Sequence, residues 1–326
     1  MGQQVVDIHA HAVLDATMGA AGRYGPELVD DDPPQFRAGD YVLHGVRYRG
    51  SAFMDPDVRL ARMDEVGIDH QVLSPNPLTY FHDIPAADAV AFCRRHNDAL
   101  AALVADRPRL HGFAALPLQD VEAAVSELRR AMSELGLLGA YVGTQAGGRE
   151  LDDPAMDPLY EALVELDVPL FLHPAPDGID RPVKDRRLGR WDLELVIGFA
   201  YDETIAVATL IYGGVLQRHP ELDVCISHGG GATPYLYGRL SAAARGRPWS
   251  PAWLREDGAF DRLLRRIWFD CHVHDEHAFR LLSEVVGTDR LVFGTNFGGW
   301  DQGGGLDLGT HHEAVLDATR RLLRWQ

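Results

Sequence analysis

The chain has 326 residues and a mass of 36.0 kDa, a length at which α/β barrels fold as one unit. Hydrophobic residues make up 46% and charged residues 24%, which is typical of a globular protein with a sizeable core. The formal net charge of −17 and the pI of about 5.2 argue against nucleic acid and anionic membranes as partners, because both require basic patches. A small anionic substrate would need local Arg, His or metal charge.

The three cysteines, Cys93, Cys225 and Cys271, have no CxxC spacing. An odd number of widely spaced cysteines argues against a disulfide framework and against a zinc ribbon, and it favours a reducing, cytoplasmic location. No targeting sequence is visible, and no stretch approaches the ~20 consecutive apolar residues that span a bilayer. We therefore expect a protein without a membrane segment.

Short apolar runs alternate with longer amphipathic segments, which is the pattern of repeated βαβ units. Eight strands are predicted: Val5–Ile8, His70–Leu73, Leu110–Ala114, Leu138–Val142, Pro169–Leu172, Asp223–Ile226, Ile267–Asp270 and Leu291–Phe293. The helices predicted after them are Asp57–Val66, Ala86–Asp106, Val121–Leu135, Asp157–Leu166, Phe199–Gln217, Thr233–Ala244, His277–Val286 and His311–Trp325. Eight such pairs predict a closed (β/α)8 TIM barrel in the α/β class, formed as one domain by residues 1–326.

Two segments interrupt this alternation. Residues 12–52 are too long for a simple connection, and we interpret them as a small insertion after strand 1 that covers the barrel mouth. Residues 174–192 form a second long loop, rich in Pro, Arg and Gly. Both segments follow strand ends, on the face where such barrels carry their active sites.

Histidines stand at the ends of three predicted strands. In the run DIHAH, the alternation of side chains places His9 and His11 on one side of the strand, together with Asp7. His173 follows the fifth strand in FLHP, and His228 follows the sixth in ISHGGG. Because the carboxyl ends of barrel strands converge and imidazole suits Zn²⁺ and similar ions, these residues predict a site for a divalent metal.

These motifs resemble the amidohydrolase-2 family, whose members are metal-dependent decarboxylases, hydratases and C–C hydrolases with a TIM barrel of the metal-dependent hydrolase type. The similarity runs from Asp7 to about Gly298 and includes MDEVGIDHQVLS, DPLYEALVELDVPLFLHP and GGVLQRHPELDVCISHGGG. The resemblance implies that His9, His11 and His173 bind the metal. It also implies that His228 contacts the substrate or the metal-bound water as a general acid or base.

The eighth strand departs from the family pattern. Most members end it with a carboxylate that binds the metal or its water, whereas FGTNFGGWD has Asn296 at that position. A neutral amide binds a cation less firmly and cannot accept a proton from water. Three explanations of Asn296 are open. It is native to a subgroup with altered chemistry, or it is an engineered substitution that traps a ligand. Alternatively, a nearby acid, Glu276 or Asp301, takes over the role of the missing carboxylate.

The seventh strand ends in FDCHVH, which is closer to the hydratase-like members than to the decarboxylases. His272 and His274 alternate to one side with Asp270, and they point either into the pocket or beneath the adjacent helix. We treat His274 as a candidate substrate contact. This strand favours the hydratase and C–C hydrolase branch.

Substrate recognition is assigned from the insertion and the loops. In the family's decarboxylases an arginine of the insertion binds the substrate carboxylate, and Arg49 or Arg47 is the residue here that matches it. Apolar walls are expected from Phe53, Trp191 and Phe297, with Tyr80 as a further candidate. The loop after His173 adds cations that could reach an acidic substrate: Arg181, Lys184, Arg186, Arg187 and Arg190.

The resemblance implies a non-oxidative decarboxylase acting on an aromatic or unsaturated carboxylic acid. In this reaction His228 donates a proton, Arg49 holds the substrate, and one divalent ion, Zn²⁺ before Mn²⁺, is bound by the histidines and Asn296. A metal-dependent C–C hydrolase or hydratase is the alternative within the family. Asn296 also leaves open an isomerase, a cyclase or a catalytically silent ligand-binding barrel. Relatives commonly dimerise, so a homodimer is a further expectation.

Overall fold

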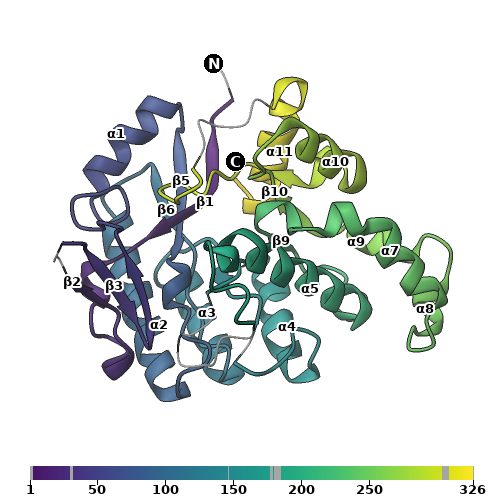
Figure 1. Ribbon diagram of the computed structural model, residues 1–326, viewed down its shortest axis with the longest axis horizontal. Coiled ribbons are helices and arrows are strands. Elements are labelled where there is room, and N and C mark those ends of the chain that lie inside the picture. Colours follow the sequence, from purple (N-terminus) through teal and green to yellow (C-terminus); the bar gives the residue numbers. More distant parts are fainter. Residues whose placement is uncertain are drawn as a thin grey trace.

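The computed structural model describes residues 3–29, 32–145, 147–176, 179, 185–302 and 308–325. Eight parallel strands form its centre, and helices surround them (Figure 1). The strands are β1 (Val6–Ala12), β5 (His70–Pro75), β6 (Leu110–Gly112), β7 (Ala140–Val142), β8 (Leu170–Leu172), β9 (Val224–Ile226), β10 (Trp268–Asp270) and β11 (Leu291–Val292). Each coincides with one of the eight predicted strands, most of them within two residues at either end.

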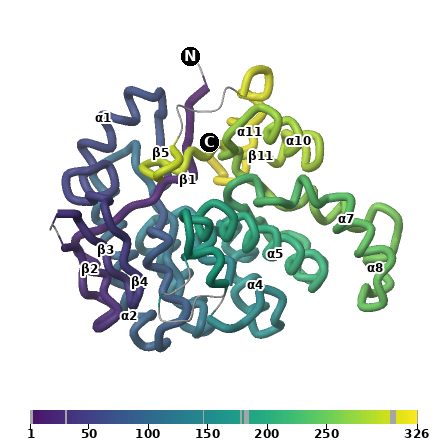
Figure 2. The backbone as a smooth tube through the Cα atoms, in the orientation of Figure 1, coloured from purple at the N-terminus to yellow at the C-terminus, as the bar shows by residue number. Residues whose placement is uncertain are grey.

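The strands follow one another around the barrel in chain order. Ladders join β1, β5 and β6 in one sheet and β7 to β11 in a second. Single bridges link the two sheets, between Ala114 and Ala140 on one side and between Ala10 and Phe297 on the other. The Ile8 N–H also donates to the Phe293 carbonyl at 3.0 Å, so the first and last strands lie side by side (Figure 2).

The helices begin and end where local chemistry dictates. The Asp55 carboxylate accepts hydrogen bonds from the first turn of α1, and Gly67 ends that helix in the left-handed region. The bounds are α1 (Pro56–Val66), α2 (Ala86–Val104), α3 (Val121–Ser133), α4 (Asp157–Leu166), α5 (Phe199–Tyr212), α6 (Val215–Arg218), α7 (Thr233–Gly246), α8 (Ala252–Arg255), α9 (Ala259–Leu264), α10 (Glu276–Val286) and α11 (His312–Leu323).

The prediction of one helix over Phe199–Gln217 was wrong at its end. Helix α5 stops at Tyr212, and α6 begins at Val215, because Gly214 adopts a φ of 76° that a continuous helix cannot contain. The short helices α8 and α9 were not predicted. A π-helical turn, Glu194–Gly198, leads into α5.

The insertion after β1 contains a small antiparallel sheet. Its strands are β2 (Glu27–Val29), β3 (Gln35–Ala38) and β4 (Tyr41–His44). Phe36 and Tyr48 pack in a buried cluster with Leu78 and Phe81, which follow the carboxyl end of β5. The inserted sheet therefore lies against residues that follow the carboxyl end of β5.

One helical stretch departs from the expectation about membranes. Within the described residues, Glu194–Tyr212 is long and apolar enough to cross a bilayer by length and composition, with a mean hydropathy of 1.5. Only 33% of it is buried. A core helix of a soluble protein meets the same criterion, so this finding alone places no segment in a membrane.

Candidate active site

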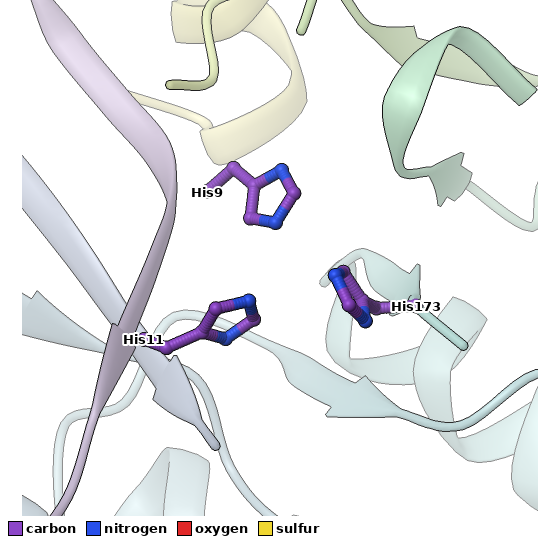
Figure 3. A group of neighbouring side chains, drawn as sticks. All are labelled: His9, His11 and His173. Carbon is purple, nitrogen blue, oxygen red and sulfur yellow. The ribbon is translucent and has the colours of Figure 1, made fainter. Parts of the chain in front are cut away.

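Three buried histidines converge inside the carboxyl end of the barrel. His9 and His11 alternate along β1, and His173 follows directly after β8. Their ring centroids lie 4.8 to 5.1 Å apart, and one ligand nitrogen from each lies within 4.8 Å of the others. The three rings face a common space (Figure 3). We refer to them as the three-histidine cluster.

Each ring of this cluster is oriented through its Nδ1 atom, which leaves Nε2 for a ligand. The Nδ1 contacts are His9 to Asp270 Oδ2 at 2.6 Å, His11 to Ser74 Oγ at 2.9 Å and His173 to the Pro174 carbonyl at 2.6 Å. The Nε2 atoms of His9 and His173 are buried and have no hydrogen-bond partner. Buried polar atoms without a partner are costly, and a bound cation removes that cost. The residues present therefore fit a divalent metal.

The electrostatics of the cluster favour neutral rings. Burial, followed by the charge of neighbouring histidines, lowers the pKa of His9 and of His173 well below the ordinary value. Burial also lowers the pKa of His11, to about 3. Only neutral imidazole can bind a metal, so the fold holds these residues in the required state.

His228 adjoins this cluster and is paired with a carboxylate. Its ring lies 5.1 Å from that of His9 and 4.9 Å from that of His173, and its Nδ1 is 2.6 Å from Glu203 Oε1 on α5. Burial lowers the pKa of His228, but the charge and hydrogen bond of Glu203 outweigh it and raise the pKa to about 9. The pair presents an imidazolium, and therefore an acid, next to the metal cluster.

The glycines after His228 are required by close packing. A Cβ atom on Gly230 would lie 2.6 Å from the Phe269 ring, and one on Gly231 would lie 2.1 Å from the Ala200 carbonyl oxygen. Both glycines have positive φ angles. This turn lets α5 approach β9 closely enough for Glu203 to reach His228.

Asn296 lies at the end of the eighth barrel strand. Its Nδ2 donates to Asp301 Oδ1 at 2.6 Å, and its Oδ1 is buried without a hydrogen-bond partner. Asp301 is thus the nearby acid, whereas Glu276 is exposed at the start of α10. Burial opposes the charged form of Asp301, but the hydrogen bond and charge of His272 hold its pKa below the ordinary range.

His272 and His274 both face Asp301. The His272 ring is largely buried and lies 5.9 Å from that of His9 and 5.7 Å from that of His228. The His274 side chain is 61% exposed, and its Nε2 lies 3.5 Å from Asp301 Oδ2. The structure therefore brings His272 to the histidine cluster and leaves His274 at its solvent edge.

Among the predicted substrate-binding cations, those within the described residues are at the surface. Arg49 is 47% exposed and donates to Asp15 at 2.9 Å, and Arg47 is also exposed. Arg187 pairs with Asp185, and Arg186 is exposed. Arg181 and Lys184 lie outside the described residues. Contact of any of these residues with a substrate stays a prediction.

The predicted aromatic walls are divided between core and surface. Phe297 is fully buried, with the guanidinium groups of Arg59 and Arg62 over its ring, which favours a packing role over a substrate contact. Phe53 packs on Tyr48, with ring centroids 5.0 Å apart. The side chain of Trp191 is 74% exposed and stacks under Arg190.

Tyr80 belongs to a pocket beside the metal cluster. Its ring centroid lies 6.4 Å from that of His173. The pocket opens between the ends of β5, β7 and β8, and its lining includes Tyr80, His82, Gly143, Thr144, Pro176 and Ile179. Its lining combines apolar and polar side chains.

Two functional carboxylates were not assigned from the sequence. Glu203 was missed, although one of two adjacent acids, Asp202 and Glu203, in the otherwise apolar helix FAYDETIAVATLIY is a usable signal. Asp270 was noted only for its alternation with His272, whereas the structure shows it orienting His9. Arg59 was missed as well, and it donates to the His11 carbonyl at 2.6 Å from a fully buried position.

A parallel barrel whose strand ends carry buried, oriented histidines is the architecture of a metal-dependent barrel enzyme. Comparison with known proteins agrees with this class. The chain belongs to the amidohydrolase family, whose model, described as Amidohydrolase, matches residues 6–323.

Its relatives include proteins named as decarboxylases and one named as a hydratase, 2-keto-4-carboxy-3-hexenedioate hydratase of a Sphingobium species, which is 28% identical over 81% of this chain and 74% of that protein. The chain is 34% identical to 2-amino-3-carboxymuconate-6-semialdehyde decarboxylase of Dictyostelium discoideum over 74% of this chain, and just under two thirds (66%) of that protein is covered. It is 32% identical to gamma-resorcylate decarboxylase of a Rhizobium species over 74% of this chain and 76% of that protein. A dihydroxybenzoic acid decarboxylase from Polaromonas, solved with manganese and 2-nitroresorcinol, aligns over 99% of this chain and 97% of its own with a TM-score of 0.76 at 23% identity. The predicted family, barrel fold and enzyme class are confirmed.

Proposed function

We propose that the protein is a metal-dependent non-oxidative decarboxylase of an aromatic or unsaturated carboxylic acid. The observation that carries this proposal is the contact between the three-histidine cluster and the His228–Glu203 pair. The cluster offers a site for one cation, and the pair offers a proton. Two of the relatives are decarboxylases of gamma-resorcylate and of 2-amino-3-carboxymuconate-6-semialdehyde by name.

The ion would be held by His9, His11 and His173, with the Oδ1 of Asn296 as a weaker, neutral ligand. A bound divalent ion supplies Lewis-acid polarisation of a substrate oxygen and a fixed point for orienting the substrate. We favour Zn²⁺ because imidazole ligands suit it, and the manganese in the Polaromonas relative makes Mn²⁺ the other candidate. Elemental analysis of protein purified from minimal medium distinguishes them.

His228 performs the proton transfer. Its imidazolium donates a proton to the carbon that bears the carboxylate, and a π bond of the substrate supplies the electron pair. The bond to the carboxylate carbon then breaks, its electron pair restores the π bond, and carbon dioxide leaves. Glu203 holds Nδ1–H throughout, so that His228 regains its proton from solvent in the same orientation.

Arg49 or Arg47 is proposed to bind the substrate carboxylate through paired hydrogen bonds. Arg49 now pairs with Asp15 at a half-exposed position, so substrate would have to displace that contact. An Arg49→Ala variant should raise KM more than it lowers kcat. An unchanged KM would remove Arg49 from the site.

A hydratase or C–C hydrolase is the second candidate. It is favoured by His272, which lies 5.7 Å from His228 and belongs to the FDCHVH motif. The test supplies metal-loaded protein with gamma-resorcylate, 5-carboxyvanillate and 2-amino-3-carboxymuconate-6-semialdehyde while carbon dioxide and substrate are both measured. Carbon dioxide equal to the substrate consumed supports the decarboxylase. Consumption without carbon dioxide, with one water added to the product or products, assigns the protein to the second class.

We also propose a cytoplasmic homodimer. All three cysteines are buried and free, as a reducing compartment allows. Ile197, Tyr201 and Ile205 are exposed at intervals of four residues on one helical face, which suits contact with a second copy. Light scattering of a Tyr201→Glu variant tests this: it should be a monomer where the parent protein is a dimer, and a parent that is itself a monomer overturns the proposal.

A further inference from the structure

A second group of potential metal ligands follows β10. His272 and His274 are two residues apart, and Val273 between them is turned toward the core, where its Cγ1 lies 3.0 Å from the site of a Cβ on Gly229. The rings of His272 and His274 lie together, with their centroids 5.2 Å apart. Asp301, from the loop after β11, meets them there. We call His272, His274 and Asp301 the β10 triad.

The two distances from Asp301 to the histidines of the triad are close to those between ligands of one ion. Asp301 Oδ2 lies 3.2 Å from His272 Nε2 and 3.5 Å from His274 Nε2, and the three ligand atoms lie within 4.8 Å of one another. Two atoms bound at about 2.0–2.1 Å to a tetrahedral ion lie roughly 3.4 Å apart. By contrast, the imidazole–carboxylate pairs His9–Asp270 and His228–Glu203 close to 2.6 Å.

Asn296 orients the carboxylate of the triad. Its Nδ2 donates to Asp301 Oδ1 at 2.6 Å, which leaves Oδ2 directed at both histidines. Such support from a neighbouring group is typical of metal ligands. An aspartate at position 296 could not donate this hydrogen bond and would instead place two carboxylates in contact. The neutral residue at the end of the eighth strand is thus accounted for by the triad.

We propose that the β10 triad binds a second divalent transition-metal ion through two histidines and one carboxylate. This ligand set suits Zn²⁺, Mn²⁺ and Fe²⁺. The Asp301 side chain is 8% exposed and that of His274 is 61% exposed, so one side of the ion faces solvent and is open to water or an anionic ligand. The site shares no ligand with the three-histidine cluster. His272 contacts both, with its ring 5.9 Å from that of His9 and 5.2 Å from that of His274.

The test is the metal stoichiometry of the 326-residue chain. The metal-free protein is titrated with Zn²⁺ in competition with a chromophoric chelator, and bound metal is counted by elemental analysis after gel filtration. The variants are His274→Ala and Asp301→Asn for the triad, His11→Ala for the first cluster and His277→Ala as a matched control. His277 is exposed, close in sequence to His274 and outside both groups.

We expect two equivalents in the parent protein and in His277→Ala. His274→Ala and Asp301→Asn should each lose one equivalent, and His11→Ala should lose the other and keep that of the triad. A parent protein that saturates at one equivalent overturns the proposal, as does His274→Ala that still binds two. Because metal is counted without substrate, these outcomes are independent of the reaction: failure of the proposed decarboxylase leaves them unchanged.

Discussion

Replacing Glu203 by glutamine tests how the protein keeps His228 protonated. The carboxylate lies 2.6 Å from His228 Nδ1 inside the protein, where its charge is poorly screened. Glutamine retains the size and a carbonyl oxygen but removes the charge. The variant therefore isolates the electrostatic contribution of this residue.

The size of the effect follows from the pKa of His228. Burial alone would lower this pKa below 6.5, and Glu203, aided by Asp270 and Asp301, raises it to about 9. The interval from 6.5 to about 9 corresponds to about 3 kcal/mol in favour of the imidazolium. At pH 7.5 a group with a pKa of about 9 is about 97% protonated, whereas one with a pKa of 6.5 is about 9% protonated. Activity that requires the acid should fall at least about tenfold.

The assay is the pH profile of kcat/KM for decarboxylation. The alkaline limb of the Glu203→Gln profile should move to lower pH by about two pH units or more. A bound dication lowers the pKa of His228 in the parent protein and in the variant alike, so the test is the difference between their two pH profiles. Glu161→Gln, which removes an exposed acid from α4, is the control and should leave the limb in place. An alkaline limb that does not move in Glu203→Gln would refute the assignment of His228 as the acid.

Three further predictions concern stability and metal binding. The metal-free protein should be most stable above pH 6.5, and its free energy of unfolding should fall toward pH 3 by about 1.4 kcal/mol per pH unit for each histidine of the three-histidine cluster. The reason is that burial lowers the pKa values of these histidines in the folded state, whereas the unfolded chain takes up protons near pH 6.5. Urea unfolding at several pH values should show this slope, and a flat profile would contradict it. Gly231→Ala should lower the urea midpoint and the activity together, because its Cβ would lie 2.1 Å from the Ala200 carbonyl oxygen. The control Gly238→Ala, on α7 with open space around it, should leave the fold intact or stabilise it by about 0.5–1 kcal/mol. Equal urea midpoints for the two variants would be evidence against the packing argument. Asn296→Asp should tighten metal binding at the three-histidine cluster, because it adds a carboxylate there, and weaken binding at the β10 triad, because it removes the hydrogen bond to Asp301. Chelator competition that finds neither affinity changed would exclude a role for Asn296 at both sites.

The barrel was predictable because its signals are local and repeated. Each apolar run between amphipathic segments became a strand, and the histidines at strand ends converged because parallel strands end on one face. Alternation along β1 was sufficient to place His9 beside His11. The metal cluster therefore follows from the positions of its residues in the sequence.

The remainder of the site depends on contacts that no local pattern contains. Glu203 reaches His228 because α5 packs closely against the glycine turn after β9. The link between Asn296 and Asp301 depends on the course of a loop. The break at Gly214 was visible as a glycine pair, but apolar periodicity on both sides of it favoured one long helix.

The most direct test of the account is decarboxylation measured against metal occupancy. Metal-free protein receives Zn²⁺ or Mn²⁺ in steps, and carbon dioxide released from gamma-resorcylate and 2-amino-3-carboxymuconate-6-semialdehyde is recorded at each step. The account predicts that release from at least one acid rises with occupancy of the three-histidine cluster and is absent from His11→Ala at every metal concentration. Carbon dioxide release by the metal-free protein, or by His11→Ala at the parent rate, would contradict it.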